Sequence, residues 1–249
     1  MDRLLVVPAA GLGTRLGGGR PKLLVEINGR SMIEHLLAMY ARVSERVAVI
    51  VHPSAESQVR ERLGAGVDLF VQQEPTGMLD AILLAGPAVA RHRPRRVLVT
   101  WCDQVAILPA TITRLHLAAA SSAAPALALL TCVRPDPYIH FDRDGAGRIC
   151  RVLHRREGDD MPAVGESDAG VFDLSFHAFQ QRLPEFAGEV QVGAGTGERN
   201  FLPFIPWLAA REEVLTVPCT SVEETIGVNT QDELAVVELY LKRRTSIDA

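Results

Sequence analysis

Residues 4–22 read Leu4-Leu5-Val6-Val7-Pro8-Ala9-Ala10-Gly11-Leu12-Gly13-Thr14-Arg15-Leu16-Gly17-Gly18-Gly19-Arg20-Pro21-Lys22. The short apolar run at the start of this stretch predicts a buried strand. The glycines that follow let backbone N–H groups approach a phosphate closely. The stretch therefore predicts a strand followed by a phosphate-binding loop.

Two common phosphate-binding motifs do not fit this loop. A P-loop needs Ser or Thr directly after its lysine, and Leu23 follows Lys22. The dinucleotide fingerprint Gly-x-Gly-x-x-Gly fails at its third glycine, where Leu16 stands, and the next predicted strand ends at His52 rather than at an acidic residue. A dinucleotide-binding oxidoreductase is therefore disfavoured, and a glycine-rich surface turn remains the alternative without a ligand.

The loop as a whole, Gly11-x-Gly13-Thr14-Arg15 followed by Pro21-Lys22, resembles the signature of the nucleotidyltransferases that make nucleoside-diphosphate sugars. The resemblance implies that Arg15 grips the β- and γ-phosphates as a bidentate donor and that Lys22 is a compact charge near the reacting phosphates. Lysine is rare here, since only Lys22 and Lys242 among 26 basic residues are lysine, which modestly supports a specific role. The nucleotide-binding residues that the resemblance implies in this loop are Ala9, Ala10, Gly11, Gly13 and Thr14.

A second segment, Gln72-Gln73-Glu74-Pro75-Thr76-Gly77-Met78-Leu79-Asp80-Ala81, follows the third predicted strand. It resembles Gln-x-x-x-Leu-Gly-x-x-x-Ala of the uridylyltransferases, which implies that the Gln72 side chain and the Gly77 backbone read a pyrimidine edge. UTP or CTP is therefore the favoured nucleotide. Thr76 and Asp80 depart from the pattern, and a plain strand end with Thr76 capping the next helix is the alternative.

The strand predicted at 97–101 is followed by Asp103, where a carboxylate could hold a hard cation beside a triphosphate. In the resembling family this aspartate binds magnesium, and a late Gly-Val-Asn segment, here Gly227-Val228-Asn229, completes the site. The resemblance thus implies Mg²⁺ at Asp103 and Asn229, with Asp103 also catalytic. Trp101 and Cys102 depart from the family pattern, and a helix-capping role for both polar residues is the alternative.

The acceptor side departs further from the family. Residues 147–154 align by pattern with a strand that ends in a sugar-binding glutamate in the N-acetylglucosamine enzymes, but His154 stands there, followed by Arg155. Residues 166–171 resemble Glu-x-Asn-x-Gly-Ile, with Asp168 in place of the amide. These changes argue against that particular sugar, and solvated charges are an equal alternative. The acceptor-binding residues that the resemblance implies are His154, Glu166, Asp168 and Gly170, with Glu198 and Asn200 as further candidates.

Apolar strand-like runs alternate with helical patterns along the chain, which predicts an α/β fold with a doubly wound, mainly parallel, Rossmann-like sheet. A hairpin predicted at 138–153 adds a small antiparallel extension on the acceptor side. We expect one nucleotidyltransferase domain over 1–249: a nucleotide-binding half over about 1–110 and an acceptor-binding half over about 111–249 that could supply a homodimer face. The helices predicted from the patterns span 31–42, 54–63, 77–90, 111–121, 175–186, 198–210 and 231–244.

Composition and sequence patterns argue against several classes of protein. A net charge of −4 and a pI near 6.0 supply no overall attraction to nucleic acid. The four cysteines form no Cys-x-x-Cys pair, which is typical of a reducing compartment. No signal peptide and no run of 18 apolar residues is present, so a cytoplasmic protein without membrane association is expected.

The expected function is transfer of a nucleoside monophosphate from a nucleoside triphosphate to a small phosphorylated acceptor, with Mg²⁺ as cofactor and pyrophosphate released. A sugar 1-phosphate is the favoured acceptor. A cytidylyltransferase acting on a small amino-alcohol phosphate or phosphonate is the alternative. A nucleotide-binding regulatory domain without catalysis is the alternative of another class.

Overall fold

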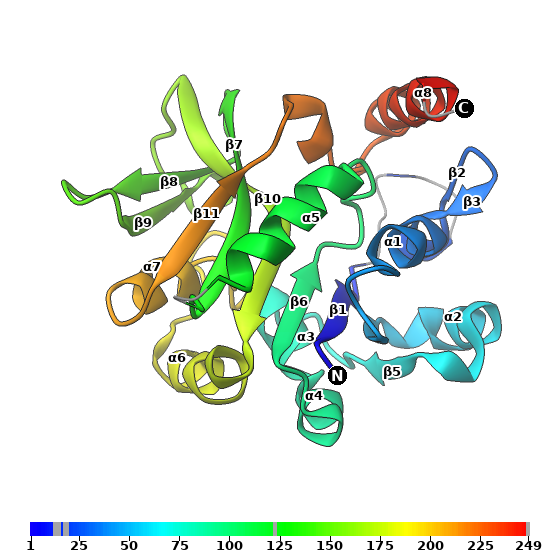
Figure 1. The fold of residues 1–249 in the computed structure, drawn as a ribbon, viewed down its shortest axis with the longest axis horizontal. Helices are drawn as coiled ribbons and strands as arrows, with labels where there is room; N and C mark the ends of the chain where they lie inside the picture. The colour runs from blue at the N-terminus through cyan, green and yellow to red at the C-terminus, as the bar shows by residue number, and fades with distance from the viewer. Residues whose placement is uncertain (12–15, 17–19, 122–123, 248–249) are drawn as a thin grey trace.

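A seven-stranded sheet forms the centre of the molecule in the computed structural model, which describes residues 1–11, 16, 20–121 and 124–247. The strand order is β11-β7-β10-β6-β1-β4-β5, and β10 alone runs antiparallel to the other six (Figure 1). The α/β, mainly parallel, Rossmann-like fold is therefore confirmed. The strands are β1 (Arg3–Ala9), β4 (Arg46–Val51), β5 (Asp68–Val71), β6 (Arg96–Thr100), β7 (Leu127–Pro135), β10 (Val164–Ser175) and β11 (Val214–Pro218).

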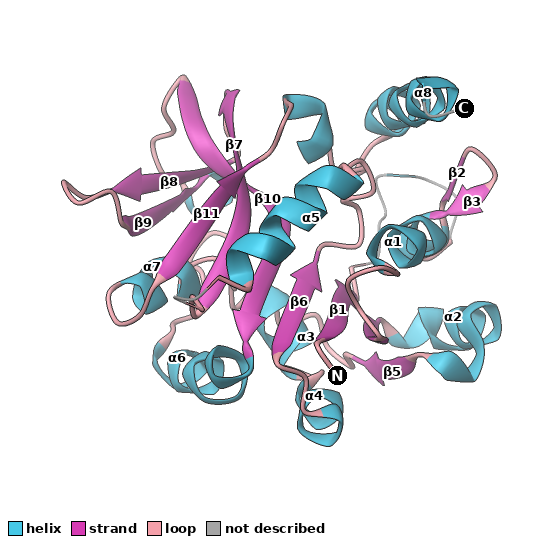
Figure 2. Ribbon diagram, viewed as in Figure 1, coloured by secondary structure: helices cyan, strands magenta, loops and turns pink. Residues whose placement is uncertain are grey.

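Helices cover both faces of this sheet (Figure 2). Side chains alternate along each strand, so Leu5 and Val7 of β1 belong to one core and Leu4 and Val6 to the other. The first core includes buried residues of α1, α2, α5 and α8, and the second those of α3, α4, α6 and α7. The helices are α1 (Met32–Tyr40), α2 (Glu56–Leu63), α3 (Met78–Leu83), α4 (Gly86–His92), α5 (Pro109–Ala119), α6 (Leu183–Glu189), α7 (Phe204–Ala209) and α8 (Gln231–Ile247).

The helix predicted from residue 31 forms as α1, and its start carries a reciprocal cap. The Glu34 carboxylate accepts a hydrogen bond of 2.8 Å from the Ser31 backbone N–H, and the Ser31 side chain completes the capping box. The cap follows the short hairpin of β2 (Glu26–Ile27) and β3 (Arg30–Ser31). Local sequence chemistry therefore sets this boundary.

Two predicted helices are shorter than expected. The helix predicted over 77–90 is divided into α3 and α4, and Pro87 lies in the first turn of α4, where its missing N–H is tolerated. The helix predicted from 198 begins only at Phe204. The reason is Arg199, whose backbone N–H donates to the Thr76 carbonyl (2.8 Å) and whose carbonyl accepts from Leu79 N–H (3.1 Å), so this segment is tied to the start of α3 instead.

The antiparallel strand β10 and the hairpin of β8 (Ile139–Arg143) and β9 (Ile149–His154) build the predicted antiparallel extension. The end of β10 pairs with β6, whereas its first half pairs only with β7 and extends past the carboxyl edge of β6. This places Asp168 and Gly170 beside the segment that follows β6, since Trp101 N–H donates to the Gly170 carbonyl (2.9 Å). In the described part of the chain, no helix is long and apolar enough to span a bilayer.

Candidate nucleotidyltransferase site

Three side chains from distant parts of the sequence meet at the carboxyl edge of the sheet. The Lys22 ammonium donates to Asp103 Oδ2 at 2.6 Å and to Asn229 Oδ1 at 2.7 Å. Lys22 begins the 3-10 turn Lys22–Leu24, Asp103 follows β6, and Asn229 precedes α8. The Lys22 and Asp103 side chains are only 12% and 14% exposed, so their mutual attraction is poorly screened by water.

Asn229 and Asp103 do not act as helix caps in this arrangement. The carboxylate of Glu233 accepts from the backbone N–H groups of Asn229 (2.7 Å) and Thr230 (2.9 Å), and Thr230 Oγ1 accepts from Glu233 N–H (3.2 Å). Thr230 therefore caps α8, while α5 begins after Leu108, well past Asp103. Both polar side chains are thus directed at the Lys22 ammonium rather than at a helix end.

The oxygens of Asp103 and Asn229 suit a hard divalent cation, because they already converge on one cationic group, the Lys22 ammonium. The described residues hold no group of three or more His, Cys, Asp or Glu side chains that could bind a metal ion unaided. Mg²⁺ keeps several waters and is usually bound through one or two protein oxygens together with substrate phosphates. The donor set therefore fits Mg²⁺ brought in with a nucleotide.

Gln72 and Gly77, the two residues predicted to read a base, lie close together after β5. The buried Gln72 side chain donates through Nε2 to the Gly77 carbonyl at 3.1 Å and to Thr76 Oγ1 at 3.3 Å. Gly77, not Thr76, is the N-cap residue of α3, and its φ of +122° favours glycine. A Cβ at Gly77 would lie 2.6 Å from the backbone N and O atoms of Arg199, so packing also requires glycine here.

The unexpected Asp80 has a structural partner. Its Oδ1 accepts from Arg199 Nη1 at 2.6 Å, which joins α3 to the segment that precedes α7. This ion pair reinforces the two backbone hydrogen bonds of Arg199 and explains why an acidic residue stands at this position. The Asp80 side chain therefore has a structural role, which is to hold these two segments together.

The first loop is described only in part. Ala9 ends β1 and is buried, Ala10 is buried beside it, and Gly11 is exposed. Gly13, Thr14 and Arg15 lie outside the described residues. Ala9 and Ala10 thus stand at the carboxyl end of β1, where parallel strands of a doubly wound sheet present ligands.

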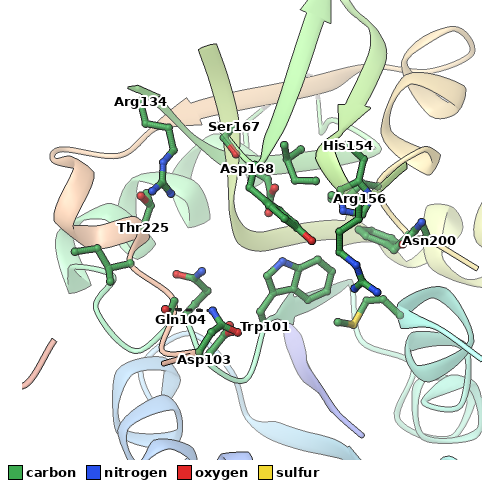
Figure 3. Close-up of a pocket in the computed structure, with 18 of the residues that line it drawn as sticks. Trp101, Asp103, Gln104, Arg134, His154, Arg156, Ser167, Asp168, Asn200 and Thr225 are labelled. Atoms are coloured by element: carbon green, nitrogen blue, oxygen red, sulfur yellow. Dashed lines mark hydrogen bonds between the residues drawn. The ribbon is translucent and has the colours of Figure 1, made fainter. Parts of the chain in front are cut away.

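A cavity of about 480 Å³ opens beside the Lys22 cluster (Figure 3). Asp103 and Gln104 lie on one side of it, Arg134 and Thr225 on a second, and His154, Arg156 and Asn200 on a third. Trp101 and Asp168 lie between these groups. The remaining lining residues are Met78, Asp136, Tyr138, Ile139, Ser167, Glu198, Phe201, Leu202, Ile226, Gly227, Asn229, Thr230 and Glu233.

Asp168 lies half-buried in the middle of this cavity. Burial raises the pKa of its carboxyl to about 6, although the backbone N–H of Gly170 (3.0 Å) and the side chain of Trp101 donate to it and partly offset the rise. Gly170 has a φ of +69°, and a Cβ there would lie 2.5 Å from Trp101 Cδ1 and 2.6 Å from Gln104 Cγ. The absence of a Cβ at Gly170 therefore leaves space for the Trp101 and Gln104 side chains.

Only some of the other residues predicted for the acceptor side line the cavity. His154 lines the cavity, and burial lowers the pKa of its imidazole. Arg155 is bound to the carboxylate of Asp136 and does not line the cavity, while Arg156 does. The Glu166 carboxylate accepts two hydrogen bonds of 2.7 Å from Arg143 and is not among the lining residues.

Sequence reasoning did not find several lining residues, notably Gln104, Arg134, Tyr138, Arg156 and Thr225. Gln104 follows Asp103 directly, and Arg156 lies two positions after His154, so proximity to predicted residues was the available signal. Arg134 and Thr225 carry no motif. Only the pairing of β7 with β10, and the turn Val222–Thr225 before Asn229, bring them to the cavity.

Comparison with known proteins gives matches over most of the chain. A family model described as MobA-like NTP transferase domain matches residues 5–164. Relatives named Bifunctional protein GlmU are 33% identical over 246 residues in Aromatoleum aromaticum, 34% identical over 250 residues in Thermus thermophilus and 28% identical over 243 residues in Brevibacillus brevis. These matches cover 96% of this chain but only 51–52% of each relative, so the chain spans about half the length of these relatives.

Proposed function

The chain belongs to the family of MobA-like NTP transferase domains, and we propose that it transfers a nucleoside monophosphate from a nucleoside triphosphate to a small phosphorylated acceptor and releases pyrophosphate. The observation that carries this proposal is the convergence of Lys22, Asp103 and Asn229 beside the cavity. One cationic donor and two oxygen ligands at a single point can neutralise the charge that accumulates between two phosphates.

We propose that the half over about 1–110 binds the nucleotide. Its phosphates would lie against the loop after β1, with Arg15 holding the leaving pyrophosphate and Ala9, Ala10, Gly11, Gly13 and Thr14 supplying backbone contacts. The Gln72–Gly77 segment would bind the base, which favours UTP or CTP. The hydrogen bond between Gln72 and the Gly77 carbonyl supports this assignment, because it fixes the orientation of both groups.

The proposed reaction requires that the two substrates are positioned for attack and that the charge on their phosphates is neutralised. A phosphate monoester of the acceptor is already anionic near neutral pH, so it can attack the α-phosphorus in line without a general base. Lys22 would leave Asp103 and Asn229 and stabilise the charge on the reacting phosphates. Mg²⁺ held by Asp103 and Asn229 would supply further neutralisation of the α-phosphate and the acceptor phosphate.

We propose a sugar 1-phosphate as the acceptor, bound in the half over about 111–249. The cavity volume of about 480 Å³ and the polar lining from His154, Asp168 and Asn200 support a ligand with several hydroxyl groups. A small amino-alcohol phosphate or phosphonate is the second candidate, with CTP as donor. The observation that favours it is Asp168, whose carboxylate could pair with an ammonium group.

The test is pyrophosphate release with Mg²⁺ across UTP, CTP, dTTP, GTP and ATP, each against sugar 1-phosphates, phosphocholine and aminoethylphosphonate. Release that needs both substrates is expected, and the best pair names the base and the acceptor class. Nucleotide binding without release from any pair would instead support a regulatory nucleotide-binding domain. Single-domain folding, a homodimer and a cytoplasmic location stay predictions.

A further inference from the structure

Arg134 has an unusual environment for an arginine. Among the described arginines that are buried or half-buried, it alone has no side-chain hydrogen bond to a carboxylate, carbonyl or hydroxyl oxygen. Its Nε atom is buried and unpartnered, and its side chain lines the cavity beside Thr225 (Figure 3). By contrast, the two buried arginines, Arg3 and Arg96, share the Asp173 carboxylate at 2.9 and 2.7 Å.

A half-buried guanidinium without a direct hydrogen-bond partner is unfavourable, because it loses hydration and gains no hydrogen bond in return. Its five N–H donors form a planar fork that matches a carboxylate or a phosphate. The nearest carboxylate in sequence, Asp136, attracts Arg134 electrostatically, but it is exposed and its oxygens bind Arg155 rather than Arg134. The donors of Arg134 are therefore available to an anion that enters the cavity.

An anion bound by Arg134 would be separate from the reacting phosphate. The reacting phosphates belong beside Lys22, Asp103 and Asn229, which cluster after β1 and β6. Arg134 is on β7, where it pairs with Gly165 of β10, and β10 stands between β7 and β6, the strand that Asp103 follows. In Figure 3, Arg134 lies beside Thr225 and Asp103 lies beside Gln104, on different sides of the cavity.

Resting on the proposed function, we propose that the natural acceptor carries a second anionic group, a carboxylate or a further phosphate, and that Arg134 binds this group. The hydroxyls of Thr225 and Ser167, which line the same cavity, can donate to the same anion. Arg134 is then a specificity-determining residue that selects acidic acceptors over neutral ones.

The side chains in the middle of the cavity indicate the chemistry of the part of the acceptor that joins its two anionic groups. Gln104 is only 8% exposed, and its Oε1 is buried without a partner. Asp168 adds a second group that accepts hydrogen bonds. The body of the acceptor therefore carries hydrogen-bond donors, either hydroxyls or an ammonium group, between its two anionic ends.

The experiment compares matched acceptors that differ by one anionic group: glucose 1-phosphate with glucuronic acid 1-phosphate, glucose 1-phosphate with glucose 1,6-bisphosphate, and phosphoethanolamine with phosphoserine. The readout is the ratio of kcat/KM within each pair, measured by pyrophosphate release. For the native chain we expect a ratio of at least about tenfold in favour of the acidic member of one pair. In Arg134→Gln that ratio should fall to about one, and Arg134→Lys should keep part of it.

Arg42→Gln is the matched control, because Arg42 is exposed and is not among the residues that line the cavity. Its ratio should equal that of the native chain. The inference is overturned if no pair favours the acidic member, or if Arg134→Gln lowers both members equally, which would place Arg134 on the reacting phosphate. Absence of pyrophosphate release from every acceptor, neutral or acidic, would overturn the proposed function itself.

Discussion

The Lys22 ammonium lies 2.6 Å from Asp103 Oδ2, although 81 residues separate the two in sequence. The same ammonium reaches Asn229 Oδ1, so a single cation satisfies two oxygens that the proposed reaction needs for Mg²⁺. Lys22 therefore holds the Asp103 and Asn229 side chains in place. In the proposed reaction, Lys22 would exchange these contacts for the phosphates.

Asp103→Asn tests the proposed metal role with little change of shape. The substitution removes a negative charge but keeps an oxygen that Lys22 can contact, so we expect the fold to survive while turnover falls on the order of 100-fold or more. Pyrophosphate release measures the loss, and circular dichroism checks the fold. Asp160→Asn, at an exposed position, is the control and should keep native turnover. Native turnover in Asp103→Asn would remove Asp103 from the site.

Lys22→Arg tests whether a compact charge is needed. The planar guanidinium is bulkier than an ammonium and cannot place a point charge between two phosphates in the space that Lys22 occupies. We expect kcat to fall about tenfold or more, with a smaller change in the KM for nucleotide. The exposed Lys242 offers the same exchange outside the cavity, and Lys242→Arg should have no effect. An equally active Lys22→Arg enzyme would contradict the assigned role.

Gly170→Ala tests the packing beneath Asp168. The added Cβ would lie 2.5 Å from Trp101 Cδ1 at a φ of +69°, so both strain and overlap oppose it. We expect a loss of about 1–3 kcal/mol in the free energy of unfolding, measured by urea denaturation. Gly145→Ala is the control, because no atom lies within 4 Å of its Cβ position and the change should stay within about 0.5 kcal/mol. Equal losses in both variants would show that neither the positive φ of residue 170 nor the overlap with Trp101 costs stability.

Asp168→Asn tests the raised pKa of the Asp168 carboxyl through stability. Because its pKa rises from 3.8 to about 6 in the folded chain, the folded state holds this proton more tightly than the unfolded state. Native stability therefore falls as pH rises from about 4 to about 6 and does not recover above that.

The amide of the variant cannot ionise, so Asp168→Asn should gain about 1–2 kcal/mol over the native chain at about pH 8 and little at about pH 4. Urea denaturation at both pH values measures the difference. The exposed Asp160→Asn variant should show no such pH-dependent gain. A difference that is the same at both pH values would mean that Asp168 ionises as freely in the folded chain as in the unfolded one.

Local sequence patterns predicted the elements well where local chemistry decides them. The capping box of Ser31 and Glu34 sets the start of α1, and the apolar runs of β1 and β4 form strands of a mainly parallel sheet as expected. The patterns were wrong at Glu198–Pro203, because the hydrogen bonds of Arg199 to Thr76 and Leu79 outweigh local helix propensity. The sequence of that segment carries no information on hydrogen-bond partners more than 100 residues away.

The sequence by itself determined the fold class and identified Lys22, Asp103 and Asn229 as candidates, because strand and helix patterns and loop motifs are encoded over short stretches of sequence. The tertiary structure decided which charges share the cavity. It directed Glu166 to Arg143, Arg155 to Asp136 and Asp80 to Arg199, and it left Arg134 facing the cavity. The sequence specifies which side chains are charged. Whether each charge is neutralised depends on contacts between strands and helices that are distant in the sequence.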